Sequence, residues 1–156
     1  MRTLQIEEKT ARKLYKTASQ EFKATLEDSF GKEFFADKIT DRVKTYADAC
    51  EETGDNQIDE IEFLKLGFSI DEIYYRKIKT ITKALNEGWV PDWNNSNEKK
   101  WAPWFNLSSS AFVFYGADYY YSYAGAGNGS RLCFKSDELA AYAAKQFTEL
   151  YKGFIK

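Results

Sequence analysis

The chain has 156 residues, of which 44% are hydrophobic and 29% charged, and 22 basic against 24 acidic side chains give it a formal net charge of −2. This composition is typical of a globular protein and excludes a disordered chain. The small negative charge disfavours general nucleic-acid binding. Histidine is absent, which excludes His-containing metal sites and Ser-His or Cys-His catalytic pairs.

The length predicts a single domain over residues 1–156 with one core. No apolar run approaches the roughly 18 residues of a membrane-spanning helix. The first residues, MRTLQIEEKTARK, lack the apolar stretch of a signal peptide. We therefore expect no membrane association and a cytoplasmic location in the host cell, or packaging in or on a virion assembled there.

Residues 1–88 are predicted to be mainly helical. A first helix is expected over residues 7–15 and a second after Ser19, which suits an N-cap. Gly31 is a stop signal for the second helix. The apolar side chains of that helix recur at every fourth position: Phe22, Leu26 and Phe30.

Two further helices begin with capping patterns. Thr45 opens a Thr-x-x-Asp sequence, which predicts a short helix ending at Gly54. Ser69 opens a capping box for the longest predicted helix, residues 70–87, which we expect to be the central one. Between them, the acidic stretch DNQIDEIEF could form a loop or a short helical turn.

The pattern changes after Gly88. Residues 89–103 hold both prolines and a polar run, and they predict a long ordered loop. Residues 111–123 alternate and are rich in aromatic residues, which predicts a strand. We expect a turn over 124–129 and a returning strand over 131–135, with a third strand over 104–107 as an option.

Ser136 is expected to cap a final helix that carries five apolar side chains at helical spacing. They are Leu139, Ala143, Phe147, Leu150 and Phe154. The predicted fold class is therefore α+β. Its parts are a helical N-terminal half (1–88), then an aromatic loop, an antiparallel sheet of two to three strands, and a C-terminal helix packing on that sheet.

Aromatic side chains fall on both faces of the predicted hairpin, because Phe112 and Phe114 alternate with Val113 and Tyr115. One closing helix can cover only one face. Either the long helix covers the second face of the hairpin, or part of that face stays exposed. Phenylalanine dominates the start of the hairpin and tyrosine its end, which favours a core that becomes more polar toward water. We expect these side chains to be mostly core.

The loop over 89–103 is the most plausible binding surface, since its tryptophans alternate with amide side chains. Such a mixture suits stacking on a sugar ring or on a partner side chain. The alternative is that the tryptophans fix an irregular loop to the core while the amides satisfy its backbone. The candidate binding residues are Trp89, Trp93, Asn94, Asn95, Trp101 and Trp104.

A second candidate is an acidic docking patch for a basic partner. From Asp48 to Glu62 there are seven acidic side chains and no basic one. The alternative is an ordinary solvated helix end and loop. The seven residues are Asp48, Glu51, Glu52, Asp55, Asp59, Glu60 and Glu62.

Cys133 is a third candidate, as a reactive thiol. If Leu132 and Phe134 face the core, Arg131 and Lys135 share the opposite face with Cys133, and two cations would lower the pKa of the thiol. The alternative is an inert core cysteine. A disulfide with Cys50 is not expected in a cytosolic chain.

No metal site, cofactor or catalytic residue is predicted. Asp92-x-Asn94-x-Ser96 looks like the start of a calcium loop. However, Asn97 and Pro103 occupy positions where an EF-hand loop needs Gly and Glu, which excludes that loop. The Gly-rich turn after Ala124 lacks the Gly-Lys-Ser/Thr ending of a phosphate-binding loop.

Three stretches together resemble a protein family of unknown function found in gut anaerobes and their phages or mobile elements. They are ITDRVKTYADACEE, KALNEGWVPDWNNSNEKKWAPWF and GSRLCFKSDELAAYAAKQFTELYK. The resemblance spans nearly the whole chain and implies a phage or mobile-element context, such as a virion component or an accessory factor. It implies no activity and no functional residues.

These observations predict a non-enzymatic interaction protein that engages a protein partner through the loop tryptophans, the acidic stretch or both. Homo-oligomerisation stays open. The alternative function is a small binding module for carbohydrate or single-stranded nucleic acid that stacks on the tryptophans. An enzyme that uses Cys133 or carboxylates is the least favoured alternative.

Overall fold

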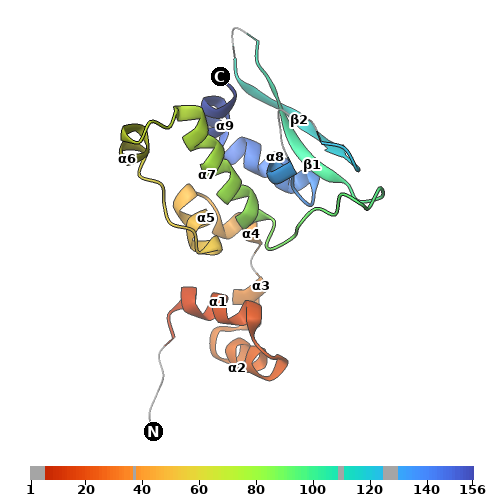
Figure 1. Cartoon of the computed structure of the whole chain (residues 1–156). Helices are drawn as coiled ribbons and strands as arrows, with labels where there is room; N and C mark the ends of the chain where they lie inside the picture. The colour runs from red at the N-terminus through yellow and green to blue at the C-terminus, as the bar shows by residue number, and fades with distance from the viewer. Residues whose placement is uncertain (1–5, 37, 109–110, 125–129) are drawn as a thin grey trace. The chain divides into compact units, whose positions relative to one another are not determined.

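The computed structural model describes residues 6–36, 38–108, 111–124 and 130–156 (Figure 1). The chain divides into two compact units, residues 1–38 and residues 39–156, and each is described by itself. The expectation that residues 1–156 form one domain stays a prediction.

The first unit contains α1 (Glu8–Thr17), α2 (Gln20–Phe30) and α3 (Lys32–Ala36). The Ser19 hydroxyl accepts a hydrogen bond from the Phe22 N–H (3.4 Å), and Gly31 ends α2 with a φ of 84°. The predicted limits of α2 are therefore confirmed. α3 was not predicted.

Aromatic contacts hold the first unit together. The rings of Tyr15 and Phe35 stack with centroids 4.2 Å apart, and Phe34 meets Phe35 edge-on at 4.8 Å. The Arg12 guanidinium lies 3.7 Å from the centroid of the Phe34 ring. Leu26 is buried, whereas Phe22 is 40% exposed, so the predicted stripe buries only part of its length.

The second unit begins with α4 (Ile39–Arg42), α5 (Tyr46–Thr53), α6 (Glu60–Lys65) and α7 (Ile70–Leu85). Capping boxes start α5 at Thr45 and α7 at Ser69, as the sequence predicts. The first half of the acidic stretch, residues 55–59, is a loop and the second half begins α6, so each of the two alternatives holds for part of it. α7 packs against α5 on one side and against the C-terminal helix on another, which confirms its central place.

The sheet consists of β1 (Lys100–Asn106) and β2 (Val113–Tyr120), which pair antiparallel. The register runs from Lys100 opposite Tyr120 to Asn106 opposite Val113, with an irregularity between Trp104 and Phe105. The predicted loop is therefore wrong from residue 100 onward. Proline has no N–H to donate to a partner strand. In a two-stranded sheet every strand is an edge strand, so Pro103 can lie in β1 where its nitrogen faces away from β2.

The predicted returning strand over 131–135 is also wrong. Ser130–Leu132 forms a 3-10 helix, η1. Only Phe134 pairs, and it pairs with Trp101 of β1: the Trp101 N–H donates to the Phe134 carbonyl (2.9 Å) and the Phe134 N–H to the Trp101 carbonyl (2.7 Å). The predicted turn over 124–129 lies, except for Ala124, outside the described residues.

The predicted C-terminal helix is divided into α8 (Asp137–Gln146) and α9 (Thr148–Ile155). Phe147 interrupts the helix with φ −116° and ψ 31°. The Thr148 hydroxyl donates to the Ala144 carbonyl (2.7 Å) just before the break. α8 packs on both strands, which confirms a helix on the sheet, whereas α9 packs against α7 (Figure 1).

The core of this unit gathers apolar side chains from α4, α5, α7, η1, α8 and α9. Each such helix presents a stripe of side chains that only the neighbouring helices can remove from water. The best-buried members include Val43, Ile78, Leu85, Phe134, Ala140 and Ala143.

The aromatic side chains of the sheet are less buried than expected. Phe112 and Phe114 are half-buried, but Tyr115 is 82% and Tyr123 85% exposed. The expectation that this segment is mostly core is therefore wrong. The reason is architectural: α8 packs on the strands, while α7 packs against α5 and α9 instead.

Candidate functional site

Residues 89–99, here called the tryptophan loop, connect α7 to β1 and are shaped by their own side chains. Asp92 Oδ1 accepts from the Asn94 N–H (2.9 Å), and Asn95 Oδ1 accepts from the Asn97 N–H (3.0 Å). Glu98 Oε1 accepts from the Asp92 N–H (2.8 Å). Such side-chain bonds to nearby backbone groups fix irregular turns. The alternative predicted that amides satisfy the loop backbone; Asn95 does so, and the carboxylates of Asp92 and Glu98, which it did not include, make the other two bonds.

Lys100, the first residue of β1, holds this loop in place with its side chain. Its side chain is completely buried, and Nζ donates to the carbonyls of Asn95 (3.1 Å) and Glu98 (3.0 Å). Nζ also lies 3.2 Å from the Glu98 carboxylate and 5.4 Å from the centroid of the Trp93 ring. This role of Lys100 was not predicted, because a lysine that follows a polar run gives no sign in the sequence that it is buried.

The four tryptophans do not form one surface. Trp89 and Trp93 line a cleft beside α7, and Trp101 packs against the core with its ring edge-on to Tyr119 at 4.9 Å. Trp104, 47% exposed, lines a different cavity between β1 and α9. Asn94 and Asn95 are exposed on the loop. The six predicted binding residues are therefore spread over four surroundings.

The cleft beside α7, here called the tryptophan-loop cleft, has a volume of about 690 Å³. Volumes of roughly 300–1,000 Å³ are usual for ligand sites. It is lined by two indoles, Trp89 and Trp93, and by three basic side chains, Lys79, Lys83 and Arg131. The Thr82 hydroxyl also lies there; it is buried and has no hydrogen-bond partner among the described residues.

One carboxylate, that of Asp55, also lines this cleft. It lies 2.8 Å from Lys83 Nζ and accepts from the Thr80 hydroxyl at 3.3 Å. The hydrogen bond from Lys83 lowers the pKa of Asp55. Asp55 therefore neutralises one of the three cations, and the lining keeps a net positive charge from Lys79 and Arg131.

Cys133 lies at the same cleft but is buried, with 4% of its surface exposed. Burial raises the pKa of its thiol to about 11. The expected lowering of the pKa is therefore wrong. The cause is that residues 131–135 are not a strand: Asn86 at the end of α7 donates to the Cys133 carbonyl (2.9 Å) and accepts from the Lys135 N–H (3.0 Å). This clamp holds the cysteine inward.

Most of the predicted acidic patch is engaged within the chain. Asp48 completes the capping box of α5 and Asp59 caps α6. Glu52 pairs with Arg42 at 3.0 Å, Asp55 with Lys83, and Glu60 with the largely buried Lys77. Glu51 and Glu62 are exposed. These partners reduce the negative charge that is available to a basic partner.

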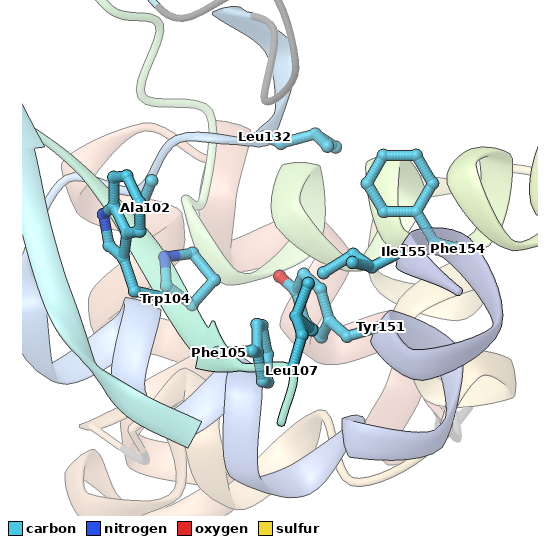
Figure 2. A pocket seen from close by; sticks show the side chains of 9 residues that line it. Ala102, Trp104, Phe105, Leu107, Leu132, Tyr151, Phe154 and Ile155 are labelled. Atoms are coloured by element: carbon cyan, nitrogen blue, oxygen red, sulfur yellow. The ribbon is translucent and has the colours of Figure 1, made fainter. Parts of the chain in front are cut away.

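The second cavity, here called the β1–α9 cavity, has a volume of about 470 Å³ (Figure 2). Its lining side chains are apolar except for Tyr151 and Trp104, and they come from β1, Leu107, η1 and α9. Tyr151 of α9 contributes its phenol, which is 3% exposed and makes no hydrogen bond among the described residues. Burial raises the pKa of this phenol, so the group remains a neutral hydroxyl near pH 7.

Within the described ranges, no three Cys, Asp or Glu side chains come together as a metal site would require. No helix in the described part of the chain combines the length and apolarity needed to cross a membrane. No protein-family model matches the sequence, and comparisons with curated proteins and with solved structures find no match.

Proposed function

We propose that this chain is a binding protein whose tryptophan-loop cleft receives nucleotide units of single-stranded nucleic acid. The observation that carries the proposal is the lining of one cleft by two indoles and three basic side chains: Trp89, Trp93, Lys79, Lys83 and Arg131. Proteins that bind single strands combine these two elements, since aromatic rings stack on bases and cations attract phosphates.

The charge of the lining favours this ligand over the carbohydrate alternative. A neutral sugar needs flat aromatic faces with hydrogen-bonding groups and gains little from two unneutralised cations. A phosphate gains from each cation and releases counterions on binding. The net charge of −2 disfavours long-range attraction to duplexes, but it leaves a local contact of this kind open.

The test is fluorescence anisotropy of a fluorescein-labelled oligothymidylate, with tryptophan quenching as a second readout. Replacing Trp93 with Ala is expected to weaken binding, because stacking on one aromatic contributes about 1–3 kcal/mol per base. The logarithm of the binding constant should fall with the logarithm of salt concentration with a slope of about −1.4, as the two unneutralised cations imply for a single strand.

The matched control is Trp104→Ala, which removes an indole outside this cleft and should leave binding unchanged. A neutral glucan oligosaccharide is the second arm of the experiment. Quenching by the glucan without binding of the oligonucleotide would favour the carbohydrate module instead. An equal loss of oligonucleotide affinity in the Trp93 and Trp104 variants would contradict the proposal. So would an affinity that does not change with salt concentration.

A protein-interaction role in a phage or mobile-element context is the second candidate. The exposure of Tyr115 (82%) and Tyr123 (85%) favours it, since tyrosine is enriched where proteins meet. A photo-crosslinking residue at position 115 or 123 should then yield adducts with one defined partner, whereas the same residue at Glu149 should not. A monomer that forms no adduct at any of these positions would contradict this role.

A further inference from the structure

We propose that the β1–α9 cavity is a second binding site, which takes a small, uncharged, largely apolar molecule that carries one hydrogen-bond acceptor. The site is separate from the tryptophan-loop cleft, because the two linings share no residue.

About 470 Å³ falls in the usual range of small-molecule sites, which are concave, mostly apolar and supplied with a few fixed polar groups. The walls are aliphatic and aromatic side chains, with Trp104 of β1 on one side and Phe154 and Ile155 of α9 on the other (Figure 2). No charged side chain lines the cavity. An ion would lose its hydration here without gaining a counter-charge, so the ligand must be neutral.

The Tyr151 hydroxyl supplies the specific contact. Figure 2 shows its oxygen pointing into the space between Trp104 and Phe154. The hydroxyl has no partner among the described residues, and a buried polar group without a partner costs about 1–3 kcal/mol. A ligand oxygen that accepts from this O–H removes that cost. Carbonyl and ether oxygens fit, because the phenol keeps its proton and donates it.

The other polar side-chain atom of the lining is the indole nitrogen of Trp104. That side chain is 47% exposed, whereas Tyr151 is buried. The indole can therefore remain hydrated when the cavity is empty, whereas the phenol oxygen is covered by its neighbours, so a ligand oxygen reaches it only when the side chains around it shift slightly. This difference assigns recognition of the ligand oxygen to Tyr151 and leaves Trp104 as an apolar wall at the edge of the cavity.

The test measures binding of two uncharged probes of nearly equal shape, acetonaphthone and ethylnaphthalene, to the whole chain. Chemical shifts of the backbone amides of Leu132 and Phe154 report occupancy of the cavity. We expect both probes to shift these signals and acetonaphthone to bind about three- to tenfold more tightly, which is the effect of one net hydrogen bond. The anion naphthoate should not bind.

Tyr151→Phe removes the hydroxyl and keeps the ring, and no hydrogen bond among the described residues is lost, so the fold should persist. In this variant the preference for the ketone should disappear. Tyr115→Phe, at an exposed tyrosine, is the matched control and should retain it.

Three outcomes would overturn the proposal. They are a ketone preference that survives Tyr151→Phe, absence of any shift at the cavity with either probe, and shifts that depend on protein concentration alone. The last result would mean that a second copy of the chain occupies the cavity. None of these measurements involves an oligonucleotide, so failure here is separate from failure of the function proposed for the tryptophan-loop cleft.

Discussion

At the scale of single residues, Lys100 decides the shape of the tryptophan loop. A buried ammonium is costly unless hydrogen bonds and an opposite charge compensate it. Lys100 has both, from two loop carbonyls and from the Glu98 carboxylate. The cation also lies near the ring of Trp93, which lines the proposed binding cleft. The loop and the cleft therefore depend on one buried side chain.

Replacing Lys100 with Met is expected to lower the free energy of unfolding by about 2–4 kcal/mol, because it removes the donor to two loop carbonyls and the counter-charge of the Glu98 carboxylate. Urea unfolding followed by circular dichroism measures the change. Lys99→Met is the matched control; Lys99 is exposed and interacts with the Tyr119 ring at 4.3 Å, so its loss should cost less than about 1 kcal/mol. Equal effects in both variants would contradict the anchoring role.

Some residue roles could be predicted from the sequence because they are local. Ser19, Thr45 and Ser69 act as caps within three or four residues of their partners, and each was identified by its spacing. Cys133 could not be placed in this way. Its orientation depends on Asn86, 47 positions earlier in the chain, and no local pattern reveals a side-chain clamp over that separation.

At the scale of elements, strand identity was easier to predict than strand pairing. The alternation in residues 111–123 identified β2, but its partner is β1 rather than the segment over 131–135. The pairing partner of a strand depends on residues far away in the sequence, and the β-propensity of the strand's own residues does not determine it. The two prolines also favoured a loop where β1 lies, since the tolerance of an edge strand for Pro103 is visible only once the sheet is known.

The packing of α9 on α7 leads to a prediction about Gly153. A Cβ at this position would overlap the ring of Tyr74. Gly153→Ala should gain about 1 kcal/mol of helix propensity but cost about 1–3 kcal/mol in overpacking, so we expect a net loss of stability. In a Tyr74→Ala background the clash is gone, and the same change should instead stabilise the protein.

Urea unfolding of the four proteins in this cycle measures the change in sign. Gly116→Ala is a control, because nothing lies within 4 Å of the Cβ position at Gly116. If Gly153→Ala destabilises equally with and without the Tyr74 ring, the close approach of the two helices is not the cause.

At the scale of the whole molecule, the chain divides at residue 38 into two compact units. The main hydrophobic core is built entirely from residues after this point, from Ile39 to Tyr151. The first unit is a short set of helices around an aromatic cluster, with Ala11 and Leu26 as its buried apolar residues among those described. Chains of so few residues bury too small a fraction of their surface to be stable alone in most cases.

We therefore expect a protein that consists of residues 39–156 to fold without the first unit. It should show the circular dichroism of its helices and a single cooperative thermal transition, since the core of this unit is complete in the shortened chain. The isolated segment 1–38 should show little helix, because short helices without tertiary packing are marginal in water. Loss of cooperative unfolding in residues 39–156 would instead favour the single domain that the chain length predicts. In that case the first unit would supply stability that the core of the second unit lacks.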